Sequence, residues 1–303
     1  LSFRTPQRRF MWEEKRLEEE AKKRGHEVTL FRASGCLMKF DGNGGIDLRS
    51  GRSPLPKFDL LIPRASALTN VQIKIAVIKH FELMGIPSLN SYHGILRAKS
   101  KLQTLQILSH YGIPVVKTAV INNPNTLKHA VDYIGQFPII MKTSYGSFGD
   151  GVTIVESHRA VKSTYGILAE SLDSTNAILI QEYIAEAANK DIRIFIVGEK
   201  MVASMERVAA LEDFRSNVGQ GGEGKLYSPS WAEVHLAIKA TKAIGLEVAG
   251  VDIIQTKNGP AIMEVNANPG FQELEEVSQV NVAEAIVKYA VKFAKEYVPE
   301  EVV

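Results

Sequence analysis

The sequence predicts an α/β protein built from more than one domain. Its 303 residues correspond to about two domains at roughly 150 residues each. Strand-like and helix-like segments alternate through residues 1–92, which predicts a small α/β unit with a parallel sheet. Residues 191–266 instead contain two pairs of apolar strands, each pair joined by a short turn, which predicts a mixed sheet.

The N-terminal unit is predicted from three kinds of segment. Residues 10–24 are charged and helix-forming, lack Gly and Pro, and are followed by a glycine, so they predict a helix. A second helix is predicted over residues 71–84, and the glycine-rich residues 41–54 predict turns or a hairpin. Short strands are predicted at residues 26–31, 58–63 and 86–89.

The same alternation continues after residue 92. Helices are predicted at residues 101–111, 126–134, 160–168, 231–245 and 281–295. Strands are predicted at residues 115–121, 137–142, 152–155, 178–183, 191–197, 200–207, 247–255 and 261–266.

Composition excludes several classes of protein. Lys and Arg total 36 against 34 Asp and Glu, a net charge of +2, which is too balanced for a nucleic-acid-binding protein. No segment approaches the roughly 18 apolar residues of a membrane helix, so no membrane partner is expected. The single cysteine, Cys36, excludes an internal disulfide and predicts a reducing, cytoplasmic location. The chain begins with Leu1-Ser2, which resembles the end of an apolar strand, so we expect the natural start to lie upstream.

The sharpest chemical signal is a pair of acids that interrupt apolar strands. Glu264 and Asn266 are two residues apart, so on a strand they share one face. The preceding hairpin turn would bring Asp252 alongside them. Two carboxylates and an amide oxygen at one place suit Mg²⁺, whereas the carboxylates alone would be costly to desolvate together. The alternative is that the three side chains face water on an edge strand.

A second signal is Lys142 at the end of an apolar strand, followed by the glycine-rich segment 144–151. An ammonium group beside backbone N–H groups can hold phosphate. The segment is not a Walker A motif, because no Gly-Lys-Ser/Thr sequence closes it, and it is not a dinucleotide fingerprint, because no helix starts at its last glycine. A simple hairpin turn is the alternative explanation.

Further polar residues follow in chain order. Gln181, Glu182, Tyr183 and Ile184 carry an acid and an aromatic side chain out of a strand, where backbone groups could contact adenine. A group of arginines with nearby polar residues could hold phosphate or carboxylate oxygens in a bidentate manner, or could form surface ion pairs. This group comprises Asp191, Arg193, Arg207, Arg215 and Asn217.

Taken in order, these segments resemble the ATP-grasp superfamily, and most closely the RimK-like α-L-glutamate ligases. The segments Asp213-Phe214-Arg215-Ser216-Asn217 and Asn266-Ala267-Asn268-Pro269-Gly270 carry most of the resemblance. The resemblance implies a small N-terminal pre-ATP-grasp domain (residues 1–92), a central lid (93–180) and a C-terminal part (181–303), the last two sandwiching ATP. It further implies a carboxylate–amine ligase that forms an acylphosphate.

The resemblance also implies a role for each site residue. Asp252, Glu264 and Asn266 would hold two Mg²⁺ or Mn²⁺ ions. Arg193, Arg207 and Arg215 would stabilise the phosphate and the acyl intermediate. The ATP-binding residues would be Lys101, Lys142, Gly146, Gly149, Gln181, Glu182, Tyr183, Ile184, Asp191, Arg215, Ser216 and Asn217. We expect L-glutamate as the amine substrate, a protein or small-molecule carboxylate acceptor, and a homo-oligomer.

This chemistry agrees with what the sequence lacks. Phosphorylation of a carboxylate needs positioning and charge neutralisation more than an acid–base residue. The sequence has neither a Gly-x-Ser-x-Gly motif nor a His-Glu-x-x-His motif, which disfavours a triad hydrolase. Three alternatives stay open: a LysX-type ligase acting on an amino-group carrier protein, a glutamate ligase for a pterin or deazaflavin coenzyme, and a non-catalytic ATP-binding protein. Intact Asp252, Glu264 and Asn266 argue against the last.

Overall fold

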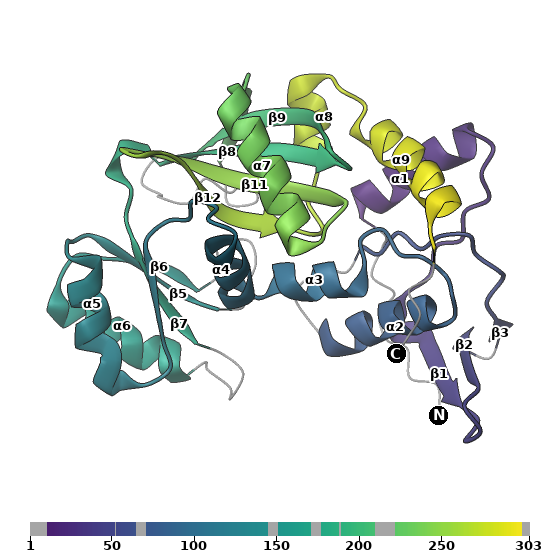
Figure 1. Cartoon of the computed structure of the whole chain (residues 1–303), viewed down its shortest axis with the longest axis horizontal. Coiled ribbons are helices and arrows are strands. Elements are labelled where there is room, and N and C mark those ends of the chain that lie inside the picture. Colours follow the sequence, from purple (N-terminus) through teal and green to yellow (C-terminus); the bar gives the residue numbers. More distant parts are fainter. Residues whose placement is uncertain are drawn as a thin grey trace.

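The computed structural model describes residues 11–51, 53–64, 71–144, 151–170, 177–187, 189–209 and 222–298. Within these residues the chain forms three antiparallel sheets with helices around them, so the predicted α/β class is confirmed (Figure 1). The predicted boundaries at residues 92 and 180 stay a prediction. Strand β7 (Ile178–Glu182), which spans the second boundary, belongs to the four-stranded sheet described below.

The largest sheet has five strands in the order β10-β9-β8-β11-β12, all antiparallel. These strands are β8 (Lys190–Val197), β9 (Lys200–Val208), β10 (Glu223–Leu226), β11 (Val248–Thr256) and β12 (Gly259–Asn266). The two predicted hairpins are therefore present as β8–β9 and β11–β12. Strand β10 was not predicted, because the glycine-rich sequence around it gives no alternating pattern.

Side-chain alternation gives this sheet two faces with different partners. One face, with Ile194 and Val251 fully buried, packs beneath α7 (Trp231–Ile244) and α4 (Lys101–His110). The other face, with Phe195 and Val248, is covered by three helices from opposite ends of the chain. These helices are α1 (Trp12–Lys23), α8 (Gln272–Ser278) and α9 (Val282–Glu296).

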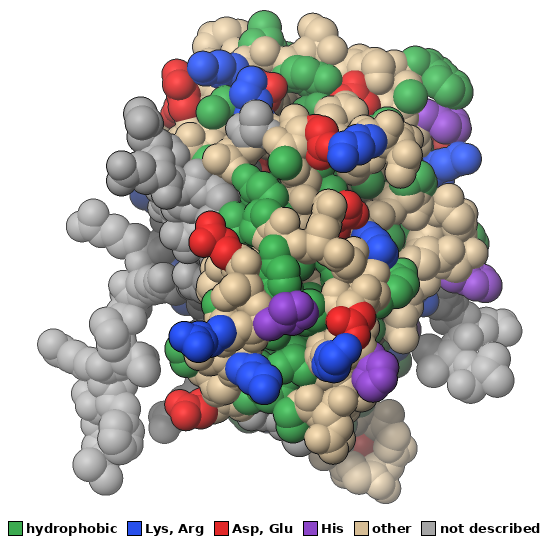
Figure 2. Space-filling view, turned by 90° about the vertical axis from the view of Figure 1, so that its left-hand side faces the viewer, with side chains coloured by type: hydrophobic (Ala, Val, Ile, Leu, Met, Phe, Trp, Pro, Cys, Tyr) green, Lys and Arg blue, Asp and Glu red, His purple; other side chains and the backbone are tan. Residues whose placement is uncertain are grey.

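A four-stranded antiparallel sheet in the order β4-β7-β5-β6 forms the second unit. It combines β7 with β4 (Thr118–Ile121), β5 (Ile139–Thr143) and β6 (Val152–Val155). Helices α5 (Leu127–Ile134) and α6 (His158–Glu170) cover one of its faces, and Figure 1 shows this unit beside the five-stranded sheet. Figure 2 views this end of the molecule, where positive and negative side chains are interspersed, as the near-zero net charge implies.

Of the parallel sheet predicted for the N-terminal unit, the described residues show one parallel bridge, and the hairpin predicted around residues 41–54 is present as an antiparallel pair. The sheet of this unit is antiparallel, with β1 (Cys36–Phe40), β2 (Ile46–Ser50) and β3 (Ser53–Pro54), and it packs on α2 (Val71–Leu83). The predicted strands at 58–63 and 86–89 meet only at one parallel bridge, between Leu61 and Ser88. Residues 26–31 form no strand, because β-forming residues need a hydrogen-bonded neighbour as well.

Two short helices, α3 (Tyr92–Lys99) and α4, connect the N-terminal unit to the rest of the chain. The hydroxyl of Ser91 accepts from the Gly94 amide, and that of Ser100 accepts from the Gln103 amide, at 3.2 Å each. These are N-terminal helix caps, and Ser100 also ends α3. Helix α3 was not predicted, because its sequence contains a glycine that lowers helix propensity.

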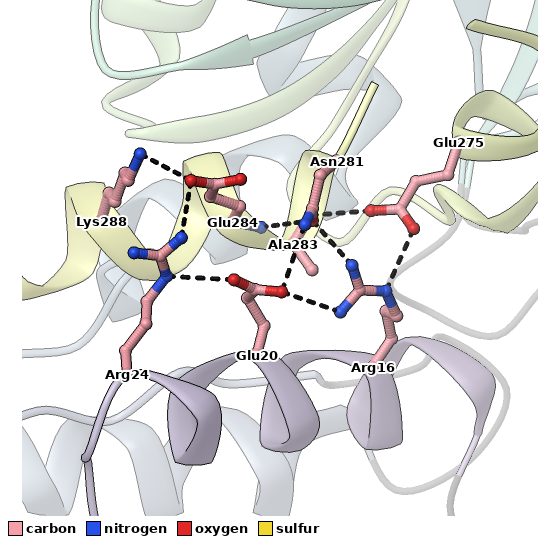
Figure 3. A network of polar contacts seen from close by, with 8 residues as sticks. All are labelled: Arg16, Glu20, Arg24, Glu275, Asn281, Ala283, Glu284 and Lys288. Carbon is pink, nitrogen blue, oxygen red and sulfur yellow. Dashed lines mark hydrogen bonds and ion pairs between the residues drawn. The ribbon is translucent and has the colours of Figure 1, made fainter. Parts of the chain in front are cut away.

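Helix α1 is held against α8 and α9 by a polar network, drawn in Figure 3. Buried Glu20 accepts from Arg16 and Arg24, and both arginines also reach acids of the C-terminal helices. Among the described residues, none of the helices combines the length and the hydropathy needed to cross a bilayer. The cytoplasmic location and the homo-oligomer stay predictions.

Candidate active site

One face of the five-stranded sheet changes from apolar to charged along its strands. On β8, alternate residues lie on this face, so the buried apolar Val197 and Phe195 are followed by the charged Arg193 and Asp191. Val248 on β11 likewise continues through Gly250 to Asp252. The apolar part of this face lies under α1, α8 and α9, so the charged part is the place where polar chemistry can occur.

The carboxylate of Asp252 is the centre of this charged region. It is 1% exposed and lies opposite Arg193 in the strand register. Arg193 donates to both carboxylate oxygens, from Nε to Oδ1 and from Nη2 to Oδ2, at 2.8 Å each. Arg207 Nη2 lies 2.9 Å from the same Oδ2, and Arg207 Nε donates to Asp191 Oδ1 at 2.7 Å. The predicted grouping of Asp191, Arg193 and Arg207 is therefore present as a buried network.

The charges in this network stabilise one another against burial. Burial alone would raise the pKa of Asp252, but the guanidinium groups of Arg193 and Arg207 outweigh it and leave this pKa lowered. Burial would lower the pKa of Arg207, but Asp252 and Asp191 outweigh it and raise this pKa above its ordinary value. Asp252 and Arg207 are thus both charged at neutral pH.

Glu264 and Asn266 on β12 lie beside Asp252, as the hairpin predicted. Glu264 is directly opposite Asp252 in the register, and Asn266 is opposite Gly250. The register shifts after Asp252, so that Ile253 pairs with Ile262 and Met263 is the extra residue of a bulge. Asn266 Nδ2 donates to Asp252 Oδ2 at 3.3 Å.

These three side chains fit a hard divalent cation by their chemistry. They offer carboxylate and amide oxygens, the donors that Mg²⁺ prefers, and an amide flip would turn the Asn266 oxygen toward Asp252. In the described part of the chain, no three His, Cys, Asp or Glu side chains form a metal-binding group. The candidate metal site therefore needs the Asn266 amide and further oxygens from a ligand or water.

A cavity lies between the two large sheets and reaches Glu264. Its empty volume, which includes open solvent, is about 350 Å³. Helix α4, strands β5 and β7, and the edge strand β12 supply the lining. Its polar lining residues are Lys101, Thr104, Lys142, Gln181 and Glu264. The two lysines predicted to hold phosphates therefore face the same space as one predicted metal ligand.

The electrostatics of this cavity favour an anion. Burial and the neighbouring charge of Lys101 lower the pKa of Lys142 to about 8, although Glu264 acts in the opposite direction. Lys142 Nζ donates to Gln181 Oε1 at 2.9 Å, and Lys101 Nζ lies 4.0 Å from Glu264 Oε1. Two ammonium groups that repel each other in a half-closed space would be stabilised by a negatively charged ligand.

Sequence reasoning missed two charged groups, one near the cavity lysines and one near Arg207. Lys99, at the end of α3, has a pKa lowered by burial and by the charges of Lys74 and Lys101. Glu273 on α8 has a pKa raised by burial, and Arg207 lies close enough to act on it in the opposite direction. Neither residue belongs to a motif, so only the packing of α3 and α8 could have identified them.

The remaining predicted residues divide into two groups. Glu182, Tyr183 and Ile184 follow Gln181 at the end of β7, where Glu182 N donates to the Lys117 carbonyl at 2.9 Å. Their adenine-binding role, and the ATP-binding role of Asp191, stay predictions. Several other predicted residues lie outside the described part of the chain: Gly146, Gly149, Arg215, Ser216 and Asn217.

Comparison with known proteins agrees with this architecture. Residues 98–290 match the RimK-like ATP-grasp domain, and residues 6–95 match the RimK PreATP-grasp domain. The chain belongs to the RimK-like ATP-grasp family. The resemblance inferred from the motifs is thereby confirmed.

Relatives in the RimK-like family match almost the whole chain. A probable alpha-L-glutamate ligase of Legionella pneumophila (strain Corby) is 36% identical over 285 residues, which cover 94% of this chain and 93% of that protein. The crystal structure of a RimK domain ATP-grasp protein from Sphaerobacter thermophilus has a TM-score of 0.73 at 21% identity, covering 93% of this chain and 97% of the other.

The ATP-grasp ligase PsnB, solved in complex with minimal precursor, Mg and ADP, has a TM-score of 0.69 at 17% identity, covering 96% and 97% of the two chains. At these identities the two solved structures bear on the fold alone.

Proposed function

We propose that this protein is an ATP-dependent, ADP-forming carboxylate–amine ligase that adds L-glutamate to a protein or small-molecule carboxylate. The observation that carries the proposal is the continuity of two charged regions. The row formed by Arg193, Asp252 and Glu264 crosses three neighbouring strands, and Glu264 also lines the cavity that contains Lys101 and Lys142. Membership of the RimK-like family and the names of its full-length relatives support the choice of reaction and of glutamate.

In this proposal the cavity binds the nucleotide. Lys101 and Lys142 neutralise its phosphates, and binding of the phosphates raises the pKa of Lys142 back toward its usual range. Asp252, Glu264 and Asn266 would hold two Mg²⁺ or Mn²⁺ ions, which when bound supply charge neutralisation for phosphoryl transfer. Residues 182–184 at the end of β7 would contact the adenine.

The arginines of the sheet act on the acyl group in this proposal. Transfer of the γ-phosphoryl group to the acceptor carboxylate gives an acylphosphate, and attack by the amine of glutamate forms the amide bond and releases phosphate. Arg193 and Arg207 stand at the charged end of the sheet, where guanidinium groups stabilise negative charge on the phosphate and on the tetrahedral oxyanion. Asp191 keeps Arg207 oriented through the bond between Nε and Oδ1.

An acceptor and amino-acid screen tests this function. The protein is incubated with ATP, Mg²⁺, each amino acid in turn and candidate acceptors, and products are read by mass spectrometry and phosphate release. The proposal expects glutamate to stimulate phosphate release and to appear in the product. Stimulation by lysine or glycine, but not by glutamate or aspartate with the same acceptor, would contradict it and favour a LysX-type ligase.

A further inference from the structure

The loop of residues 267–271, which follows Asn266 and leads into α8, is held by side chains of the N-terminal unit. These contacts join segments that are more than 170 residues apart in the chain. The loop begins at the residue after a candidate metal ligand, so its position sets the direction in which β12 leaves the sheet.

Asn90 makes the most complete of these contacts. Its side chain is buried, and the residue is 2% exposed. Asn90 Nδ2 donates to the Ala267 carbonyl at 2.9 Å and to the Val248 carbonyl at 2.7 Å. Its Oδ1 accepts from the backbone amides of Glu247 and Val248 at 2.8 Å each. The amide thus ties the start of β11 to the residue that follows Asn266 and has no hydrogen-bonding capacity left.

Arg64 holds the middle of the loop. Its Nη2 donates to the Pro269 carbonyl at 3.0 Å, and its guanidinium carbon lies 5.7 Å from the centre of the Phe271 ring. Burial lowers the pKa of Arg64 to about 10, with Glu13 acting in the opposite direction. Glu13 Oε1 in turn accepts from the Phe271 amide at 3.3 Å.

The loop needs such support because, within the described chain, it contains an unpartnered buried oxygen and packs very closely on β11. The Oδ1 atom of Asn268 is buried and has no hydrogen-bond partner among the described residues, which destabilises this conformation of the loop. Pro269 also lies tightly over β11, where a Cβ on Gly250 would come within 2.7 Å of the Pro269 Cβ. A loop under these constraints keeps its position only if neighbouring groups fix it.

We propose that Asn90 and Arg64 are positioning residues that fix loop 267–271 and thereby place Asn266 for metal binding. The N-terminal unit then contributes to the site by positioning the loop, although it supplies no proposed metal ligand. The proposal rests on the proposed function in one respect, the role of Asn266. A displacement of about 1 Å in a catalytic group can lower activity about 100-fold, so a modest movement of the loop is enough.

The test compares Asn90→Ala and Arg64→Met with Tyr289→Phe in the full chain. Tyr289 donates to the carboxylate of Glu247, whose backbone amide is held by Asn90. Within the described part of the chain Tyr289 makes no hydrogen bond to the loop, so its variant controls for loss of a hydrogen bond. The two readouts are the affinity for Mn²⁺ in the presence of a non-hydrolysable ATP analogue, by electron paramagnetic resonance, and amide hydrogen exchange of residues 267–271.

The proposal expects Mn²⁺ affinity to fall about 10- to 100-fold in Asn90→Ala and Arg64→Met, as is typical for residues that orient metal ligands. Exchange in residues 267–271 rises in both variants, and Tyr289→Phe changes neither readout. Wild-type Mn²⁺ affinity or unchanged exchange in a folded Asn90 or Arg64 variant overturns the proposal, and Arg64→Met decides alone if Asn90→Ala does not fold. A wild-type protein that binds no Mn²⁺ overturns the proposed function instead, while hydrogen exchange still shows whether these side chains hold the loop.

Discussion

Two buried carboxylates, Asp252 and Glu20, have nearly the same immediate surroundings. They are 1% and 2% exposed, and each accepts from two arginines and one asparagine side chain. Burial would raise the pKa of each, but the polar partners outweigh it and both pKa values are lowered. The side chains that directly contact each carboxylate therefore do not distinguish the two clusters.

The clusters differ in what surrounds those partners. The partners of Glu20 are fully engaged elsewhere: Arg16 also reaches Glu275, Arg24 reaches Glu284, and Asn281 caps α9 (Figure 3). This network joins α1 to α8 and α9. Asp252 instead lies beside Glu264, which lines a cavity with two lysines. A buried ion-pair network joins helices in one place and lies beside a lysine-lined cavity in the other.

Glu264→Gln should give the largest effect on activity. In the proposed function Glu264 holds the metal, so replacing its carboxylate by a neutral amide should lower ligase turnover by about 10³-fold, equivalent to about 4 kcal/mol. The side chain of Glu264 is 37% exposed, so the free energy of unfolding should change by less than about 1 kcal/mol. Phosphate release and chemical denaturation measure the two quantities. Asp252 is a poorer target, because its removal would leave Arg193 and Arg207 buried without their shared partner.

Glu20→Gln should give the opposite pattern. Loss of its charge weakens the pairing of Arg16 and Arg24, but both arginines are partly exposed and keep Glu275 and Glu284 as partners. The protein should therefore be destabilised by about 1–2 kcal/mol. Turnover of the folded fraction should stay within about twofold of the wild type. A large loss of turnover at a temperature where this variant is folded would show that the two clusters are not separate in function.

Lys142→Met should raise stability while it abolishes nucleotide binding. Because the pKa of Lys142 in the folded protein is about 8, against 10.5 for an ordinary lysine, the unfolded chain holds more protons between these values. Stability of the ligand-free protein should therefore rise as pH increases from about 8 to about 10.5, and this rise should be smaller in the variant. At pH 7 we expect a gain of about 1–2 kcal/mol after the lost bond to Gln181 is considered. A destabilised variant that still binds ATP would contradict the assignment.

Lys288→Ala should give the smallest effect. Lys288 is 62% exposed and contacts Glu284 at the rim of the Glu20 network. Exposed ion pairs of this kind contribute about 0.5 kcal/mol or less. The difference in Tm between low and high salt, measured by thermal denaturation, should be nearly the same for this variant and the wild type. This result would show that the exposed edge of the network contributes much less to stability than its buried centre.

The sequence predicted the parts of the site that depend on local pattern. The β11–β12 hairpin follows from two apolar strands around a short turn, and the register opposite Asp252 follows from that hairpin. The pairing of Arg207 with Asp252 could not be predicted in the same way. It depends on β8 lying between β9 and β11, an order that the separate hairpins do not specify.

Packing between distant segments accounts for the other differences. Asn90 lies between Ser88 and Ser91 in a short segment that carries no motif, and its four side-chain hydrogen bonds come from chain more than 150 residues away. The N-terminal sheet was predicted as parallel because strand and helix alternate in the sequence. Its described strands instead pair locally, as β1, β2 and β3, and segment 58–63 keeps only one bridge.

We propose that the charged end of the five-stranded sheet and the lysine-lined cavity form one metal–nucleotide site. This claim is tested most directly by titrating Mn²⁺ into the wild type, Glu264→Gln and Glu20→Gln, each saturated with a non-hydrolysable ATP analogue. Mn²⁺ affinity should fall at least about tenfold in Glu264→Gln and stay at the wild-type value in Glu20→Gln. Equal affinity in the wild type and Glu264→Gln would contradict this claim.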